Sequence, residues 1–326
     1  MPLLLTKEDV VRVLDMRDCM NVVEKAFAEL ASGTAVLPLR IGIAPPDGVS
    51  LYMPAYLKQM GALACKVVTV YKNNPTRHNL PTIIGKVLLQ DPATGEVICI
   101  MDGGYLTAVR TGAVSGLATK YLARTGMGHV AAIVGAGVQA KMQLWAMATT
   151  RELSRAYVYD VSADALSAFI PEMSAKLRLE ILPADSPAQM LAVADIVCTA
   201  SSSSTPLFDG SLVRPGTHIN GIGSHSPNAR ELDTAIIQRS RVVVDSVEAC
   251  LKEAGDIMIP LQEGAISQAH IQTELGDVVL GRKPARTNAQ EITLFKSVGL
   301  AIQDAAAAQL VYERARQAGV GQNVVI

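Results

Sequence analysis

One segment near the middle of the chain constrains the fold more than any other. The apolar residues 130–134 run directly into GAGVQA at 135–140, which has the pattern G-x-G-x-x-A, and a helical stretch follows. In such a strand–turn–helix unit the first glycine permits the tight turn, the second lets backbone amides approach a pyrophosphate, and the alanine allows close packing of the helix on the strand. The helix start offers N–H groups and a positive dipole end to an anion. The segment predicts a dinucleotide site that uses Gly135, Gly137, Val138 and Gln139.

The residue that ends the next predicted strand supports this interpretation. Asp160 follows the glycines by about 20 residues, where the dinucleotide pattern has an acidic residue that binds the adenosine ribose hydroxyls. A carboxylate there disfavours the 2′-phosphate of NADP(H), and residues 161–164 hold no Lys or Arg that would bind it. We therefore favour NAD(H), with NADP(H) as the alternative. An ordinary turn between a strand and a helix is the competing interpretation of the glycines.

The predicted pattern of helices and strands changes at about residue 129. The first third predicts a helix over about 7–32 with Thr6 as its N-cap, a helix over about 107–123, and strands at 67–71, 86–90 and 97–102. The turn sequence DPATG at 91–95 predicts that the last two strands form a hairpin. Beyond residue 129, strands are predicted at 130–134, 156–160, 179–182, 195–200, 217–222 and 242–245. Because helical stretches alternate with these strands, we expect an α/β fold with a parallel sheet. Residues 299–318 predict one Ala-rich helix.

Composition narrows the class of protein. The 326 residues include 29 Lys and Arg against 30 Asp and Glu, so the chain lacks the basic balance of a nucleic-acid binder. No apolar run approaches the roughly 20 residues of a membrane helix, and the N-terminus lacks the pattern of a signal peptide. The five scattered cysteines are typical of a reducing compartment, and the histidines show no ligand spacing. We expect a cytoplasmic protein without a metal site, a nucleic-acid partner or a membrane segment.

Isolated basic residues are the candidates for substrate binding. Arg40, Lys66 and Arg110 each lie in an apolar neighbourhood, where a charge is costly unless it is paired. A substrate carboxylate could be the partner, and the alternative is that each side chain reaches solvent or pairs with a nearby Asp. His225, in a loop after a predicted strand, is a candidate proton donor because imidazole titrates near neutrality. Asp304 and Glu274 are expected on solvated helix faces.

Several motifs together carry a resemblance to a known family. The segments that carry it are MPAY at 53–56, Lys66, LPT at 80–82, MDG at 101–103, RTGA at 110–113, GAGVQA at 135–140, THINGIG at 217–223, RELD at 230–233 and FKSVGLA at 295–301. With these segments the chain resembles the ornithine cyclodeaminase/μ-crystallin family over nearly its whole length.

The resemblance implies a fold and a set of site residues. The implied fold is a Rossmann-type domain at 123–299, inserted into an α+β substrate-binding and dimerisation domain formed by 1–122 with 300–326. The implied activity passes hydride between a nicotinamide ring and the α-carbon of an amino acid or its imine. Arg40, Lys66 and Arg110 match the residues that hold the substrate carboxylate. The residues expected to contact the cofactor outside the glycine loop are Thr82, Arg110, Thr111, Asp160, Ser224 and Ser297.

One departure from the family pattern concerns the loop after Gly223. The cyclodeaminase and the alanine dehydrogenase have an aspartate in place of His225 and a lysine in place of Ala229. Because the cyclodeaminase uses that aspartate to hold the substrate's side-chain amine, the resemblance favours the ketimine-reductase branch. The expected substrates are cyclic ketimine carboxylates such as Δ1-pyrroline-2-carboxylate and Δ1-piperideine-2-carboxylate, which would yield L-proline and L-pipecolate. Lys66, His225 or solvent would supply the proton.

Three alternative functions stay open. The first is an alanine-type amino-acid dehydrogenase, and the second is an ornithine cyclodeaminase that uses NAD catalytically. The third is a non-catalytic protein that binds NAD(P)H. The charged fraction of 18% lies below the usual quarter, so part of the apolar surface is expected in a homodimer interface built by the N-terminal strands and the C-terminal helix.

Overall fold

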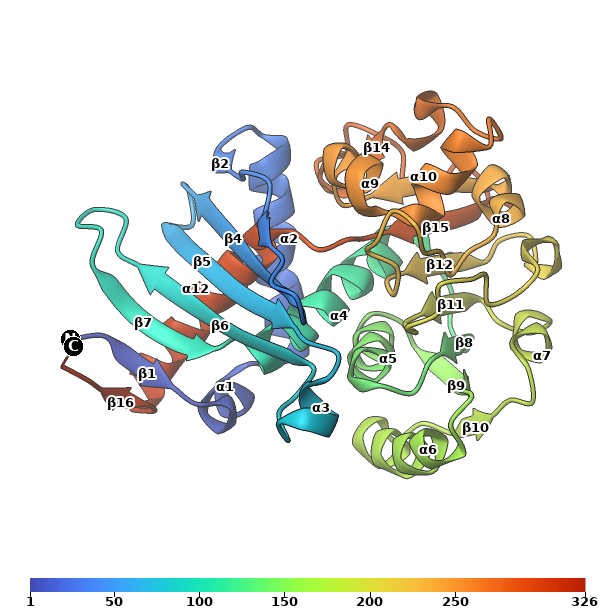
Figure 1. The fold of residues 1–326 in the computed structure, drawn as a ribbon. Helices are drawn as coiled ribbons and strands as arrows, with labels where there is room; N and C mark the ends of the chain where they lie inside the picture. Colours follow the sequence, from blue (N-terminus) through green and yellow to red (C-terminus); the bar gives the residue numbers. More distant parts are fainter. Residues whose placement is uncertain (326) are drawn as a thin grey trace. The chain divides into compact units, whose positions relative to one another are not determined.

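The computed structural model describes residues 1–325, which form two compact units. The first unit comprises residues 1–111 together with the C-terminal stretch from Leu300, and the second comprises Gly112–Gly299. The chain therefore leaves the first unit, builds the second and returns to the first, as the colours of Figure 1 show. The division falls within helix α4 (Gly103–Leu122), and the expected domain boundary at residue 122 is the last residue of this helix.

The first unit is built on a mixed sheet. Its strands are β1 (Leu3–Leu5), β2 (Ala35–Val36), β3 (Ile41–Ile43), β4 (Val49–Leu57), β5 (Ala62–Val70), β6 (Ile83–Gln90), β7 (Val97–Asp102) and β16 (Gln322–Asn323). They pair in the order β16-β1-β7-β6-β5-β4-β2, with β3 also paired to β4. Strands β6 and β7 form the expected antiparallel hairpin, whose turn is closed by a 2.8 Å bond from Gly95 N–H to the carbonyl of Asp91.

The N-terminal helical region differs from its prediction. Instead of one helix there are two, α1 (Lys7–Val13) and α2 (Met16–Ala31). Leu14 has an extended backbone, and the carboxylate of Asp15 accepts the N–H of Arg17 at 2.8 Å, so Asp15 caps a new helix. The expected cap at Thr6 is confirmed, because Thr6 and Asp9 form a reciprocal capping box.

One face of the first sheet is covered by helices. Side chains alternate along β5, so that Ala64, Lys66 and Val68 are buried while their neighbours are half-exposed. Helices α2 and α12 (Ala301–Ala318) pack on the sheet, and in Figure 1 both lie behind its strands. The small, buried residues 305–308 of α12 are all alanine, which allows this close approach. The predicted Ala-rich helix is confirmed. The remaining helix of this unit is the short α3 (Asn74–Arg77).

The second unit is built on a wholly parallel sheet. Its strands are β8 (His129–Val134), β9 (Leu153–Tyr159), β10 (Ile181–Pro183), β11 (Ile196–Thr199), β12 (His218–Gly221), β13 (Ser240–Val244), β14 (Thr273–Glu274) and β15 (Ile292–Lys296). They lie in the order β10-β9-β8-β11-β12-β15-β13-β14, and each pairing is parallel. All six strands predicted after residue 129 form, and the α/β fold class with a Rossmann-type sheet is confirmed.

The helices of the second unit alternate with these strands. They are α5 (Val138–Thr150), α6 (Ala163–Leu177), α7 (Pro187–Leu191), α8 (Thr234–Arg239), α9 (Val247–Glu253), α10 (Gly255–Gln262) and α11 (Leu275–Val279), with 3₁₀ turns at Gly210–Leu212 and Gln268–Ile271. Strand order reverses between β8 and β11, so the loops after these two strands meet at the carboxyl edge of the sheet. That edge is where ligands bind in open α/β sheets. Within residues 1–325, no helix combines the length and the apolar character that crossing a membrane requires.

Candidate active site

The glycine loop lies where the strand order reverses, and its two glycines serve different purposes. Gly135 has φ +111°, and a Cβ added to it would lie 2.5 Å from the carbonyl oxygen of Ala200 on the neighbouring β11 loop. Only glycine fits that position. Gly137 is the N-cap of α5, where no side chain caps the helix, and no atom lies within 4 Å of a Cβ built on it. The space before the helix N-terminus is therefore open, which fits an incoming pyrophosphate.

Three other predicted nucleotide residues lie in or beside the glycine loop. Val138 is 65% exposed at the start of α5, and the buried Oε1 of Gln139 has no hydrogen-bond partner among the described residues. Asp160, directly after β9, accepts the N–H of Ala136 at 2.7 Å and the N–H of Ser162 at 2.9 Å. Each carboxylate oxygen keeps a second acceptor position, so Asp160 both fixes the glycine loop and can accept a ribose hydroxyl. The residues present fit a dinucleotide.

The first unit contains a buried ion cluster formed by three segments far apart in sequence. Lys66 Nζ on β5 lies 2.7 Å from Asp304 Oδ2 on α12, and Arg110 Nε on α4 lies 2.9 Å from Asp304 Oδ1. The side chains of Lys66 and Asp304 are 1% exposed. Arg110 also donates from Nη1 to Oε1 of Gln303, whose Nε2 is buried without a partner among residues 1–325. The cluster thus holds two cations and one carboxylate.

The expectation for Asp304 was wrong. It does not lie on a solvated helix face, because the face of α12 that carries it packs against the sheet of the first unit. Glu274 is likewise not on a solvated helix face: it ends β14, is half-buried, and accepts the N–H of Val247 at 2.8 Å. The Ala-rich pattern of residues 301–318 hid both Gln303 and Asp304, because a buried polar pair in a helix rich in alanine looks like the polar stripe of a surface helix.

Burial and neighbouring charges together set the pKa of Lys66. Burial lowers its pKa most, Arg110 lowers it further, the carboxylate of Asp304 raises it, and the net result is a pKa of about 8. Arg40, which is half-buried, also lowers the pKa of Lys66, so both predicted carboxylate-binding arginines act electrostatically on Lys66. A lysine in this state can exchange a proton near neutral pH.

The two predicted threonines are placed in the first unit. Thr82 is half-buried before β6, and its carbonyl accepts the N–H of Tyr71 at 2.8 Å. Thr111 is buried one residue after Arg110 on α4, and its Oγ1 donates to the carbonyl of Thr107 at 2.7 Å. Their contacts to a cofactor stay predictions.

The loop after β12 carries the predicted Ser224 and His225. Ser224 is buried: its hydroxyl donates to the carbonyl of Ala229, and its own carbonyl accepts from Lys296 Nζ at 2.6 Å. His225 is exposed, with Nδ1 3.2 Å from the carbonyl of Gly223. The hydroxyl of Ser224 therefore closes its own loop, and the loop presents the imidazole of His225 to the surface.

A network of buried charges, which the sequence reasoning missed, anchors this loop. Lys296 Nζ at the end of β15 lies 2.7 Å from Asp256 Oδ2, and neither side chain is exposed. Asp256 Oδ1 accepts the N–H groups of Glu231 and Leu232 at 2.8 and 3.0 Å. Burial lowers the pKa of Lys296, but Asp256 and Glu231 more than offset it, so the pKa is raised and the lysine stays charged.

Glu231 extends the network to two neighbouring loops. Its Oε1 accepts the N–H and the hydroxyl of Ser201 after β11, each at 2.7 Å, and its Oε2 accepts the N–H of Gly223 after β12 at 2.7 Å. Asp245, after β13, accepts the hydroxyl of Ser297 at 2.7 Å in the same way. The carboxyl edge of the parallel sheet is therefore held by ionised side chains buried beneath its loops. The predicted Ser297 belongs to this framework.

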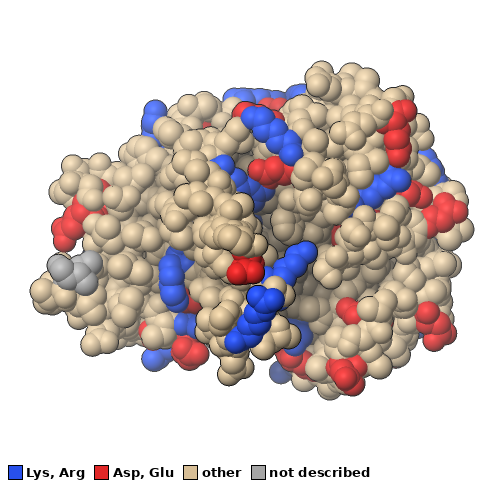
Figure 2. Space-filling model, viewed as in Figure 1, with Lys and Arg blue, Asp and Glu red and all other residues tan. Residues whose placement is uncertain are grey.

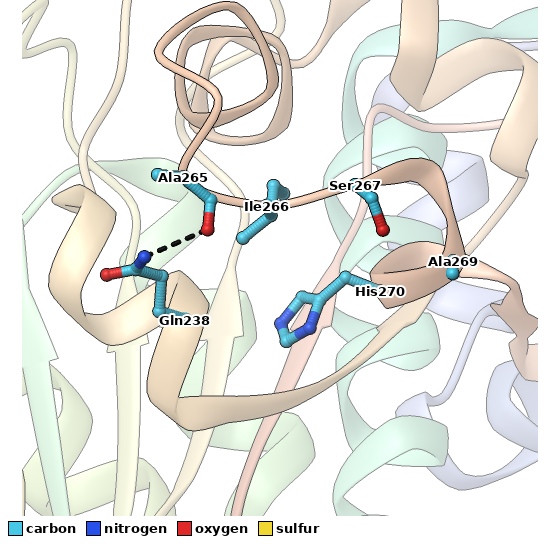
Figure 3. A pocket seen from close by; sticks show the side chains of 6 residues that line it. All are labelled: Gln238, Ala265, Ile266, Ser267, Ala269 and His270. Atoms are coloured by element: carbon cyan, nitrogen blue, oxygen red, sulfur yellow. Dashed lines mark hydrogen bonds between the residues drawn. The ribbon is translucent and has the colours of Figure 1, made fainter.

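A shallow depression on the second unit, with a volume of about 490 Å³, is separate from the predicted site residues. Its lining residues are Gln238, Ala265, Ile266, Ser267, Ala269 and His270. As Figure 3 shows, Gln238 bridges across it to the carbonyl of Ala265, at 2.9 Å. His270 Nε2 lies 2.7 Å from the carbonyl of Ile237. The polar groups here are engaged with backbone, and no predicted site residue lines the depression. Among residues 1–325 no group of His, Cys, Asp and Glu could hold a metal ion.

Comparison with known proteins places the chain in a family. Residues 1–319 match the model of the ornithine cyclodeaminase/mu-crystallin family, and the chain belongs to that family. It is 35% identical over 325 residues to a delta(1)-pyrroline-2-carboxylate reductase of Bacillus cereus, covering 99% of each chain.

Two solved structures have the same fold over their full lengths. One is the Thermococcus litoralis delta(1)-pyrroline-2-carboxylate reductase in complex with NADH and L-proline, with 46% identity, a TM-score of 0.95 and coverage of 99% of this chain and 100% of that one. The other is an archaeal alanine dehydrogenase dimer with bound NAD, with 34% identity, a TM-score of 0.94 and coverage of 100% and 99%.

The buried pair of Lys296 and Asp256 yields a stability prediction. Lys296→Met leaves the Asp256 carboxylate buried without its cation, and we expect it to lower the free energy of unfolding by about 3–5 kcal/mol. The double variant Lys296→Met/Asp256→Asn removes both charges while Asn keeps an acceptor for the N–H groups of Glu231 and Leu232. It should be more stable than Lys296→Met alone in urea unfolding. A double variant whose loss equals the sum of the two single losses would show that the pair is not coupled.

Proposed function

We propose that this protein is an NAD(H)-dependent reductase of cyclic ketimine carboxylates, the class of Δ1-pyrroline-2-carboxylate and Δ1-piperideine-2-carboxylate. The observation that carries the proposal is the buried cluster of Lys66, Arg110 and Asp304, in which two cations share one internal carboxylate. The excess positive charge, to which Arg40 adds, is suited to a second carboxylate. A substrate carboxylate supplies that charge, and a guanidinium binds it with directed hydrogen bonds.

Each group in the cluster has a defined task in this proposal. Asp304 and Gln303 accept from Nε and Nη1 of Arg110 and thereby fix the plane of its guanidinium. Arg40 and Arg110 hold the substrate carboxylate, and Gln303 Nε2 offers a buried donor without an acceptor in the described chain. Lys66 holds a proton at Nζ that can pass to the imine nitrogen. His225 is the second candidate donor, because it lies on the exposed loop after β12.

The cofactor is assigned to the open N-terminus of α5 and to Asp160. When bound there, reduced nicotinamide supplies the hydride that reduces the C=N bond. Gly137, Val138 and Gln139 would contact the pyrophosphate, and Asp160 the adenosine ribose. The carboxylate of Asp160 supports NAD(H) over NADP(H), and both solved relatives named above contain NADH or NAD.

A second candidate function is that of an alanine-type amino-acid dehydrogenase. The likeness to the archaeal alanine dehydrogenase over the whole chain favours it. Both reactions place hydride on an imine carbon beside a carboxylate, so the same cluster would serve either. They differ in whether the imine is cyclic and preformed or arises from a keto acid and ammonia.

A substrate panel separates the two functions. We expect NADH oxidation with pyrroline-2-carboxylate and piperideine-2-carboxylate, because the cluster binds the carboxylate and the ring already contains the imine. We expect kcat/KM for pyruvate with ammonia to be at least 10-fold lower. Ornithine with NAD serves as the test for cyclodeamination and should give no ammonia. Absorbance at the NADH band measures the reductions, and an assay of released ammonia measures cyclodeamination, which uses NAD catalytically. Failure of both cyclic imines with both NADH and NADPH would refute the proposal.

The two glycines of the nucleotide loop give a matched pair of variants. Gly137→Ala adds a methyl group to open space, so we expect thermal stability to be unchanged while NADH binds at least 10-fold more weakly in a fluorescence titration. Gly135→Ala places a methyl group against the carbonyl of Ala200 at a strained φ, so we expect lower stability as well. Unchanged NADH affinity in Gly137→Ala would place the pyrophosphate elsewhere.

We also propose a homodimer formed through the open face of the first sheet. The outward side chains of paired strands are largely apolar, as in the row Pro54, Cys65, Leu88 and Ile100 across β4 to β7. Ile41 on β3 is 61% exposed beside Tyr52. Figure 2 shows few charged side chains over these strands. The archaeal alanine dehydrogenase is described as a dimer, which supports the proposal. A cytoplasmic location stays a prediction.

Sedimentation velocity tests the dimer. We expect a dimer at micromolar concentration, and we expect Ile41→Lys to weaken it because the substitution places a charge in the apolar face. Met127→Lys is the control, since Met127 is 81% exposed in the second unit, outside the first sheet. A wild-type monomer, or equal effects of the two substitutions, would contradict the proposed interface.

A further inference from the structure

One buried carboxylate in the first unit has a role that substrate binding alone does not explain. Asp304 lies in the first turn of α12, where the helix dipole favours a negative charge. A site built only to bind a substrate carboxylate would be weakened by a permanent anion among its cations. Yet Asp304 contacts both Lys66 and Arg110 and is 1% exposed.

We propose that Asp304 is a positioning residue that holds Lys66 as the proton donor to the imine nitrogen. This inference rests on the proposed reductase function and deepens it. It chooses Lys66 over His225 as the donor, and it gives Arg110 a second task, which is to fix Asp304.

The geometry supports a directed chain of contacts. Gln303 accepts from Nη1 of Arg110, and Arg110 Nε donates to Asp304 Oδ1 at 2.9 Å, so the carboxylate is fixed from one side. Its other oxygen, Oδ2, then lies 2.7 Å from Lys66 Nζ. This ion pair holds the ammonium of Lys66 beside a carboxylate that is itself fixed by Arg110. His225, by contrast, lies exposed on the loop after β12, with Nδ1 3.2 Å from the carbonyl of Gly223.

The charges that act on Lys66 come from three other segments of the first unit. Arg110 on α4 and Arg40 before β3 favour the neutral amine, as does burial, whereas Asp304 on α12 favours the ammonium. Burial raises the pKa of the neighbouring Cys19 on α2 to about 12, so that thiol stays neutral. With a pKa of about 8, Lys66 is protonated at neutral pH and is a stronger acid than a free lysine. Of the three charged side chains that act on Lys66, Asp304 raises its pKa and so favours the proton on Nζ.

The proposed step transfers one hydride and one proton to the C=N bond. Hydride from reduced nicotinamide brings an electron pair to the imine carbon and forms a C–H bond. The π electron pair of the C=N bond moves to nitrogen and takes the proton of Lys66 Nζ, which forms the N–H bond of the amino acid. Lys66 is left as a neutral amine beside Asp304, and a proton from solvent restores the ammonium. Nicotinamide is oxidised and the imine is reduced.

The sign of each charge predicts opposite effects for two variants. Asp304→Asn removes the group that raises the pKa of Lys66, so the pKa falls. The alkaline limb of the pH profile of kcat/KM, where activity is lost as pH rises, therefore moves to lower pH. Arg110→Met removes a group that lowers it, so the limb moves to higher pH. We expect displacements of about 1 pH unit or more. A merely structural role for Asp304 would lower activity without moving the limb. His225→Gln is the matched control and should leave the limb where it is in the wild type.

Carbamylation by cyanate reports the protonation state of Lys66 in the absence of substrate and nicotinamide. Cyanate reacts with the neutral amine, so the pH midpoint of Lys66 labelling, followed by mass spectrometry of its peptide, reports its protonation. Other lysines of the same sample are the internal reference, and circular dichroism establishes that each variant is folded. Downward displacement of the midpoint in Asp304→Asn, and upward displacement in Arg110→Met, would support the proposal.

Three outcomes would overturn it. The first is a Lys66 midpoint that is the same in wild type and Asp304→Asn. The second is a midpoint that moves while the alkaline limb of kcat/KM does not, and the third is a limb that moves only in His225→Gln. In the second and third cases the proton would come from another group. The reductase function is decided separately by the substrate panel, so its failure is distinguishable from failure of this inference.

Discussion

The ion cluster of Lys66, Arg110 and Asp304 is the interaction on which the first unit depends. Its members come from β5, α4 and α12, which the chain builds at widely separated points, and the last arrives only after the second unit is complete. A buried pair of this kind is weak evidence for stability, because desolvation offsets much of the attraction. Its burial in an otherwise apolar layer of alanine and valine is better explained by the proposed function, in which the cluster binds an anionic substrate.

The second unit uses buried charge for a different purpose. Asp256 and Glu231 accept backbone N–H groups, and Lys296 donates to the carbonyl of Ser224, in loops at the carboxyl edge of the parallel sheet. Loops tied in this way keep the open N-terminus of α5 and the His225 loop in fixed positions relative to the sheet. Each unit thus contains buried charged side chains, with a cationic excess in the first and an anchoring network in the second.

The sequence predicted what local pattern controls and missed what distant packing decides. The glycine loop, the parallel strands after residue 129 and the hairpin at 86–102 follow from turn chemistry and hydrophobic periodicity, and they form as predicted. Strand β15 was missed because its short run ends in Lys296, whose charge is buried only through Asp256, a residue 40 positions earlier. Asp304 was misplaced for the same reason, since nothing near it in the chain reveals its partners. The break at Asp15, by contrast, has a local signal, because Asp is a favoured helix N-cap.

The central claim is that the cluster binds the carboxylate of an imino or amino acid, and calorimetry tests it most directly. L-Proline and L-prolinamide would each be titrated into the protein in the presence of NADH, so that no turnover occurs, and into Arg110→Met. The account predicts that L-proline binds at least 10-fold more tightly than its amide, since each hydrogen bond to a charged group contributes about 1.5–3 kcal/mol, and that this preference disappears in Arg110→Met. Equal affinities for acid and amide in the wild type would contradict it.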